Sequence, residues 1–104
     1  MILSNKAVIS QGEDYSLIVV GEEVTLITGN VKVFLWNKAL DVKQEGTCSE
    51  SNVNTIEATF TKEMTAQLPI GNVCLEILVI GSDSKEKVYF KEDYGTIRKS
   101  VSNT

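Results

Sequence analysis

The chain has 104 residues, of which 42% are hydrophobic and 23% charged, and its formal net charge is -4. This length and composition are typical of one small globular domain, covering residues 1–104, and exclude a disordered chain. The negative charge argues against nucleic acid and against anionic membrane surfaces as partners, because both attract basic proteins.

Alternating apolar and polar residues predict short strands along the first third of the chain. An uneven apolar stretch predicts a strand at residues 2–9, followed by strands at residues 15–20 and 24–28. Turn residues separate these strands, including Gly12, which can adopt a positive φ. Residues 2–9 also lack the basic start and the apolar run of a signal peptide, so we expect no secretory route.

The next predicted strand, residues 31–36, is apolar on both faces. One face carries three aliphatic side chains: Val31, Val33 and Leu35. The other face carries Phe34 and Trp36. Two interpretations remain open for these aromatics: they belong to the core of a central strand, or they form an exposed contact with a partner.

A tight turn at Asn37 and Lys38 then leads into a short predicted strand at residues 39–43. Residues 44–52 are polar throughout and are predicted to be the longest loop of the chain. If the protein binds a ligand as a monomer, this loop is the expected contact surface.

The middle of the chain, residues 56–80, predicts a strand, one helical turn and a second strand. Residues 56–60 alternate with a period of two, which is typical of a half-buried strand. Thr61 is positioned to cap a short helical turn, with Met64 and Leu68 on one side. Pro69 ends this turn, because the residue before a proline is disfavoured in the α region.

Gly71 and Asn72 are predicted to form a turn before the most apolar run of the chain, residues 73–80. A strand that is apolar on both faces is usually central in its sheet. The alternative is an exposed edge that pairs with a strand of a partner.

The end of the chain is predicted to contain two further strands. Residues 81–84 form a polar hairpin connection, 85–90 a strand, 91–95 a turn and 96–101 a last weak strand, before a tail at 102–104. About eight short strands with turns every 8–12 positions predict an all-β, immunoglobulin-like antiparallel β-sandwich. Trp36 precedes both cysteines, so the spacing of a true immunoglobulin domain is absent.

Nothing in the residue types indicates catalysis. The chain has no histidine, which excludes Ser-His-Asp and Cys-His nucleophile systems. Paired carboxylates occur at residues 13–14, 22–23 and 92–93, all in predicted turns, where a solvated surface is the simpler interpretation. We therefore expect no enzyme and no catalytic or cofactor-binding residues.

No metal or nucleotide site is expected either. Asp83 and Asp93 lie outside any loop of the EF-hand type, so calcium binding is unsupported. Cys48 and Cys74 are too few for a zinc site. The two cysteines are either free thiols in a reducing compartment or a disulfide, and both alternatives remain open.

Three stretches carry a resemblance to a known family: QGEDYSL at residues 11–17, FTKEMTAQLPIGNVCLEI at 60–77 and KEDYGTI at 91–97. Together they resemble the small immunoglobulin-like β-sandwich domains of phage tail and baseplate proteins, such as the N-terminal domain of upper-baseplate proteins. In those domains, a strand ends in T-x-E-x-T-x-x-L-x-x-G and the following strand ends in L-E-I. The resemblance covers most of the chain.

The resemblance implies a structural or assembly module of a phage or prophage tail that acts through protein–protein contacts. Its partners would be copies of itself, other tail proteins or both. It would lie in the host cytoplasm during assembly and in the virion afterwards. The alternative function is a monomeric binding module for carbohydrate or peptide. The candidate interface residues are the aromatics Phe34, Trp36, Tyr89 and Tyr94; the two tyrosines could instead form a platform for stacking a sugar.

Overall fold

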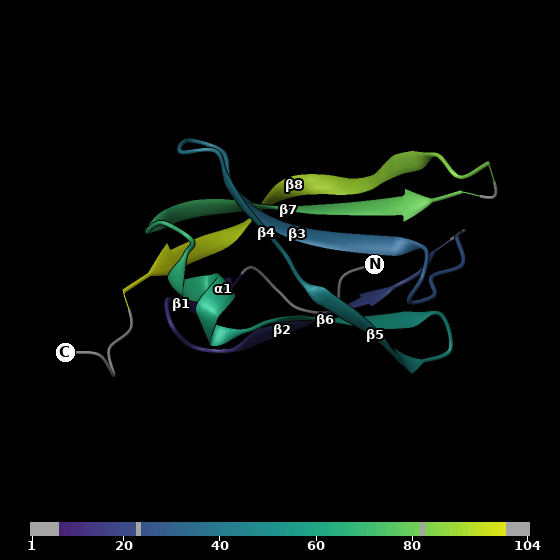
Figure 1. Ribbon diagram of the computed structural model, residues 1–104, viewed down its shortest axis with the longest axis horizontal. Coiled ribbons are helices and arrows are strands. Elements are labelled where there is room, and N and C mark those ends of the chain that lie inside the picture. Colours follow the sequence, from purple (N-terminus) through teal and green to yellow (C-terminus); the bar gives the residue numbers. More distant parts are fainter. Residues whose placement is uncertain (1–6, 23, 82, 100–104) are drawn as a thin grey trace.

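Two β-sheets lie face to face and enclose the core, as Figure 1 shows. The structure, a computed structural model, describes residues 7–22, 24–81 and 83–99. One sheet has the strand order β1-β8-β7-β3-β4 and the other has the order β2-β6-β5. The strands are β1 (Ala7–Ser10), β2 (Tyr15–Val20), β3 (Val31–Asn37), β4 (Val42–Glu45), β5 (Thr47–Asn52), β6 (Thr55–Phe60), β7 (Gly71–Ile80) and β8 (Glu86–Arg98).

The predicted all-β sandwich of about eight strands is confirmed by these two sheets. One pair of strands differs from a purely antiparallel arrangement, because β1 runs parallel to β8, with Ala7 opposite Gly95 and Ser10 opposite Arg98. The predictions for residues 2–6, for Glu23 and for the last strand and tail beyond Lys99 fall outside the described residues.

Alternate side chains of β2, β3, β6 and β7 form the core between the sheets. The alternation predicted for residues 15–20, 31–36 and 56–60 is confirmed, since every second residue of these strands is buried apart from Tyr15, which is partly buried. The large side chains with almost no exposure include Phe60, Leu17, Leu35, Leu75 and Ile77. Burial of this apolar surface drives the two sheets together.

β7 is central, as its apolar sequence predicted. It lies between β3 and β8, and its residues 73–77 are buried in succession. The alternative that this strand forms an exposed edge is therefore wrong. The predicted turn at Gly71 and Asn72 is wrong as well, because both residues already pair with β8. Gly71 has a φ of 138°, a value that favours glycine and allows the strand to begin there.

The single helical turn, α1 (Lys62–Ala66), begins after Thr61 as predicted and ends at Ala66, before Pro69. The Thr61 side chain accepts a hydrogen bond from the backbone N–H of Met64 and so caps the helix. Leu68 is fully buried, and Met64 packs partly against the core. The helix is also tied to the turn before β2, because the Asp14 side chain accepts a hydrogen bond from Lys62 N.

The strand predicted at residues 24–28 is wrong, because this segment is a loop. The Asn54 side chain donates hydrogen bonds to the backbone oxygens of Gly21 and Val24 and accepts one from Leu26 N. The side chain of one asparagine thus supplies hydrogen bonds to backbone groups that would otherwise need a neighbouring strand as their partner.

The loop predicted at residues 44–52 is also wrong. Residues 44 and 45 complete β4, and residues 47–52 form β5. β5 is an edge strand whose side chains are almost all exposed, so its sequence shows no apolar alternation. The strand predicted at residues 39–43 begins only at Val42, because residues 38–41 form a turn with Asp41 at a φ of 54°.

The turn predicted at residues 91–95 is part of β8, which runs without a break from Glu86 to Arg98. Two irregularities in its pairing with β7 absorb the extra residues, one near Val73 and one near Ile77. Such bulges bend a strand and do not end it. The carboxylates at residues 92–93 therefore lie on a strand, contrary to the prediction.

Gly46 allows the chain to pass from one sheet into the other. It is buried between β4 and β5, and its N–H donates a hydrogen bond to Val33 O at 2.8 Å. A Cβ atom on Gly46 would lie 2.8 Å from Cζ of the Phe60 ring, which is closer than packed atoms approach. The crossing therefore requires a residue without a side chain.

Gly46→Ala is expected to lower the free energy of unfolding by about 1–3 kcal/mol, the usual cost of overpacking a core. Gly29→Ala is the matched control, because a Cβ atom there meets nothing within 4 Å. Its stability should change by no more than about 0.5 kcal/mol. Urea denaturation of both variants measures the difference, and equal stability of the two would contradict the proposed clash.

Candidate functional site

The face of the five-stranded sheet that points away from the three-stranded sheet carries two of the four aromatic candidates, Phe34 and Trp36. We call it the outer face. Phe34 lies opposite Glu76, and Trp36 lies opposite Cys74 on β7 and opposite Lys43 on β4. Residues opposite each other on neighbouring strands share a face. Because the intervening residues of β3 are buried in the core, this set points outward.

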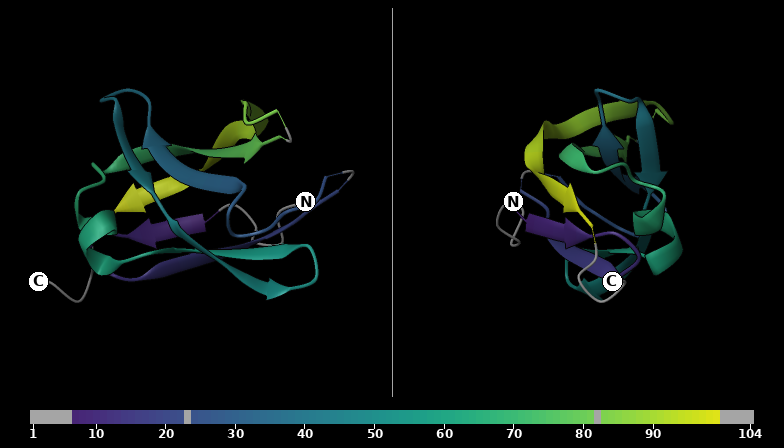
Figure 2. Two further views of the ribbon diagram at one scale, coloured as in Figure 1. Left: turned by 45° about the vertical axis from the view of Figure 1, so that its right-hand side comes forward. Right: turned by 90° about the vertical axis from the view of Figure 1, so that its left-hand side faces the viewer.

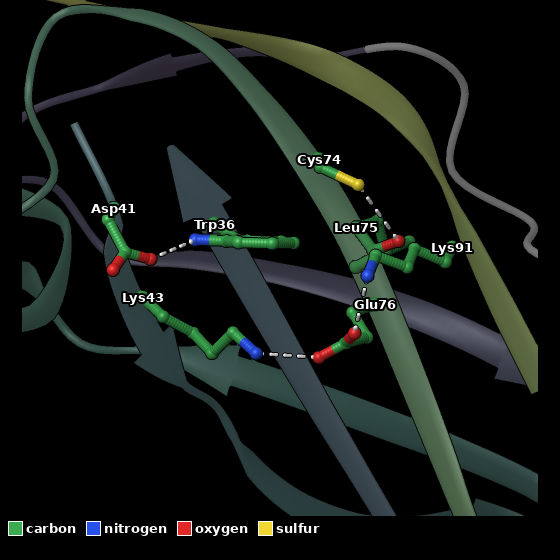
Figure 3. Close-up of polar contacts among 7 residues, drawn as sticks. All are labelled: Trp36, Asp41, Lys43, Cys74, Leu75, Glu76 and Lys91. Atoms are coloured by element: carbon green, nitrogen blue, oxygen red, sulfur yellow. Dashed lines mark hydrogen bonds and ion pairs between the residues drawn. The ribbon is translucent and has the colours of Figure 1, made fainter. Parts of the chain in front are cut away.

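Four side chains form a compact group on the outer face that we call the Trp36 cluster: Trp36, Lys43, Glu76 and Lys91, the last of which lies opposite Glu76 on β8. Lys43 Nζ lies 2.8 Å from Glu76 Oε1, and Lys91 Nζ lies 3.6 Å from Glu76 Oε2. Both ammonium groups are 4.8 Å from the centroid of a Trp36 ring. Figure 3 shows the two lysines reaching different oxygens of the Glu76 carboxylate. The ammonium groups of Lys43 and Lys91 thus interact both with the Trp36 ring and with the Glu76 carboxylate.

Glu76 is nearly removed from solvent although it points outward, with 8% of its side chain exposed. The hydrogen bond from Lys43 is the main cause that lowers the pKa of Glu76, and Lys91 acts in the same direction against the effect of burial. The Trp36 ring is fixed as well, because its Nε1 donates a hydrogen bond to Asp41 Oδ1 at 3.1 Å. Every polar group in the cluster has a partner, which suits a rigid contact surface better than proton transfer.

Aliphatic side chains continue the outer face beside the cluster. Leu78 on β7 lies opposite Lys32 on one side and opposite Val88 on the other. Val88 is 58% exposed. At the border of this region, Lys32 Nζ is 2.6 Å from Glu86 Oε2, and this hydrogen bond raises the pKa of Lys32. The outer face therefore combines apolar side chains with charged pairs, and the ion pairs of Glu76 lie on its central strand, β7.

Of the four candidate aromatics, only Phe34 and Trp36 are brought together, both half-buried on the outer face. Tyr94 is buried in the core, where its hydroxyl is hydrogen-bonded to that of Tyr15 and the two rings meet edge to face. Burial is the main cause that raises the pKa of Tyr15. Tyr89 holds the loop after β2, since its hydroxyl donates to Glu22 O and accepts from Glu22 N. The two tyrosines do not form a platform.

The described part of the surface includes three shallow hollows. The first, of about 340 Å³, lies between the β3–β4 turn and the start of β7 and includes Leu40 and Ile70. The second, of about 380 Å³, is polar and lies beside Gly46. The third, of about 300 Å³, includes Val88 and Tyr89. Tyr89 is the one aromatic residue lining these three hollows, and Trp36 lines none of them.

Both cysteines are free thiols, and they belong to different sheets. Burial is the main cause that raises the pKa of Cys48 and of Cys74, which reduces the reactive thiolate form. Within residues 7–22, 24–81 and 83–99, no group of three or more acidic or cysteine side chains is arranged to hold a metal ion. Over the same residues, no helix has the length and apolar character to cross a membrane.

Sequence reasoning missed the role of Glu76. The available signal was a carboxylate inside the most apolar run of the chain, where a charge needs a partner. Its partners Lys43 and Lys91 are 33 and 15 positions away in sequence, and only the strand register brings them together. A glutamate in an apolar strand thus indicated a buried ion pair. Which lysines pair with it could be learned only from the structure.

Glu76→Gln is expected to lower stability at neutral pH and to weaken its dependence on pH. Since the folded protein lowers the pKa of Glu76 below its ordinary value of 4.5, the carboxylate stabilises the fold above that value. This contribution is lost as the pH falls through the lower, folded-state pKa. The difference in unfolding free energy between wild type and Glu76→Gln should therefore be largest above about pH 5 and should shrink in more acidic solution.

Urea denaturation over a series of pH values measures this difference. The control is Glu92→Gln, an exposed carboxylate on β8 that makes no ion pair with another described residue. If Glu76→Gln and Glu92→Gln differ from wild type by the same amount at every pH, the proposed role of the ion pairs is wrong.

Comparisons with known proteins provide no family for this chain. Protein-family models, curated proteins and solved structures were searched, and none of them matches it. A functional assignment therefore depends on the residues and the geometry described above.

Proposed function

We propose that this protein is a non-enzymatic structural module that assembles through protein–protein contacts. One observation supports this function above the others: four large apolar side chains lie on the outer face, although the opposite face of the same sheet already encloses the core. Phe34, Trp36, Leu78 and Val88 occupy outward positions on three neighbouring strands. A sheet with one solvated face normally carries polar residues there.

The Trp36 cluster also prepares this face for binding. Tryptophan is enriched among the residues that contribute most to binding energy in interfaces. Here the ring is held by a hydrogen bond to Asp41 and by two lysines that are themselves paired with Glu76. Side chains that are already ordered lose little conformational freedom when a partner docks.

We place this module in the tail or baseplate of a phage or prophage, because its sequence resembles domains of those proteins. Its partners are then copies of itself, other tail proteins or both. It would occupy the host cytoplasm during assembly and the virion afterwards. The net charge of -4 supports protein partners over nucleic acid or membrane.

A second candidate function is a monomeric binding module for peptide or carbohydrate. The observation that favours it is the edge strand β5, which pairs with β6 on one side and exposes almost all of its side chains. An extended peptide can add to such an edge through main-chain hydrogen bonds. The hollow beside Tyr89 is a weaker site for a sugar, because the tyrosine hydroxyl already bonds Glu22.

The mass of the protein in solution, measured by light scattering after size exclusion over a range of concentrations, tests the proposed function. Wild type should form oligomers. Val88→Asp should raise the dissociation constant about tenfold or more, corresponding to ~1.4 kcal/mol, because it places a carboxylate beside Leu78 on the outer face. Val88 is already exposed, so the fold should tolerate this change.

Ser16→Asp is the matched control, because it adds the same charge at an exposed position of the opposite sheet. It should leave the oligomers unchanged. A wild-type protein that stays monomeric at the highest concentration would contradict self-association and would favour the second candidate function.

A further inference from the structure

We propose that the hollow beside the start of β7 binds an extended, uncharged peptide segment with an aliphatic side chain, which adds to the open edge of β7 at Asn72. This inference goes beyond the proposed function, because assembly through the outer face requires no such segment. Cys74 belongs both to the outer face and to the lining of the hollow, so the two surfaces are adjacent. Their roles are separated by substitutions that belong to only one of them.

β7 extends beyond the part of β3 that pairs with it. The pairing of the two strands ends at Trp36 opposite Cys74, and the chain turns away after Asn37. β7 itself begins at Gly71 and pairs there with β8 alone. Figures 1 and 2 show the β3–β4 turn and the start of β7 at the same end of the molecule. The hollow of about 340 Å³ lies between them.

The backbone N–H and C=O groups of Asn72 point towards this hollow. Along a strand, such groups point alternately to the neighbours on either side. Ile80 N donates a hydrogen bond to Asn30 O, just before β3, so the even-numbered residues of β7 direct their backbone groups to the β3 side. Asn72 is one of them, but Lys38, which would lie opposite it, already belongs to the turn.

The β8 side gives the same orientation independently. Gln11 N donates a hydrogen bond to Arg98 O, so the even-numbered residues at the end of β8 face β1 and the odd-numbered residues face β7. The odd-numbered residues of β8 lie opposite residues 71 and 73 of β7, and Asn72 between them faces away. No turn or loop of the described chain supplies a backbone partner for the N–H or the C=O of Asn72.

A peptide in the extended conformation fits these open groups. One of its residues, placed where β3 would have continued, can accept a hydrogen bond from Asn72 N and donate one to Asn72 O. This is the bonding by which a strand adds to the edge of a sheet. A small apolar molecule without an amide group leaves both backbone groups of Asn72 unused, so the edge of β7 favours a peptide.

The walls of the hollow favour an uncharged, aliphatic segment. Leu40 is 62% exposed and Ile70 is 58% exposed, and a side chain lying between them would remove apolar surface from water. The two charged residues of the lining, Lys38 and Asp93, have opposite signs. A charged ligand would be attracted by one of them and repelled by the other.

Asn37 holds both walls in place before a ligand arrives. Its Oδ1 accepts a hydrogen bond from Leu40 N, and its Nδ2 donates one to Pro69 O, next to Ile70. The Asn37 side chain is itself buried, with the residue 3% exposed. Because the walls are already ordered, little conformational freedom is lost when a segment docks.

Nuclear magnetic resonance tests the site with a defined probe, the uncharged peptide acetyl-Thr-Val-Thr-Val-Thr-amide. The protein is isotope-labelled Val88→Asp, which weakens contact through the outer face and lies outside the hollow. Without peptide, the amide hydrogen of Asn72 should exchange with solvent faster than that of Val73, which faces β8. With saturating peptide, exchange at Asn72 should slow about tenfold or more, because this amide gains a hydrogen bond.

Ile70→Asp added to this protein should raise the dissociation constant of the peptide about tenfold or more, because it replaces an apolar wall by a charge. Ile27→Asp is the matched control, since Ile27 is 48% exposed and lies outside the hollow, and it should leave the binding unchanged. Isopentanol, a branched alcohol without an amide group, should bind more weakly than the peptide. Circular dichroism confirms that each variant is folded, and the exchange at Asn72 depends on neither isoleucine substitution.

Four results would overturn the peptide site: an Asn72 amide that is already protected without peptide, exchange at Asn72 that the peptide leaves unchanged, equal binding to Ile70→Asp and Ile27→Asp, or isopentanol that binds as tightly as the peptide. Chemical-shift changes confined to β5 would also contradict it and would assign the peptide to that edge strand. The proposed function is decided by a different measurement, the masses of wild type and Val88→Asp in solution.

Discussion

β7 has to be covered on both of its faces, and the order of the strands around it follows from this requirement. Its inward side chains meet the three-stranded sheet, while its outward Glu76 is covered by Lys43 from β4 and Lys91 from β8. A carboxylate with so little exposure is stable only with such partners, since an unpaired buried charge is costly. The cations come from strands on both sides of β7, so the ion pairs connect β4, β3, β7 and β8 across the sheet.

The sequence predicted those elements whose residues alternate between core and solvent. Residues 15–20, 31–36 and 56–60 show this alternation, and the capped turn at Thr61 follows from local chemistry. β5 was missed because an edge strand exposed on both faces has no apolar pattern. The loop at residues 24–28 was mistaken for a strand because its apolar residues are held by a distant side chain, that of Asn54, which no local pattern reveals.

The candidate site was predicted in part, for a related reason. Phe34 and Trp36 were identified because both faces of their strand are apolar, and the structure places both at the outer face. Tyr94 could not be assigned to the core from its neighbours, because the bulge in β8 next to it changes which residues point inward. The ion pairs of Glu76 depend on the register of four strands, β4, β3, β7 and β8, which is a long-range property.

The parallel pairing of β1 and β8 has a mechanical consequence. The hydrogen bonds between them join residues 7–10 to residues 95–98, near the two ends of the described chain. In neighbouring parallel strands, tension applied before β1 and after β8 pulls the strands past each other along their length. All the hydrogen bonds of this ladder then carry the load together, whereas in a hairpin pulled open from its ends they would break one after another. A subunit under tension within a larger assembly would resist extension through this pair of strands.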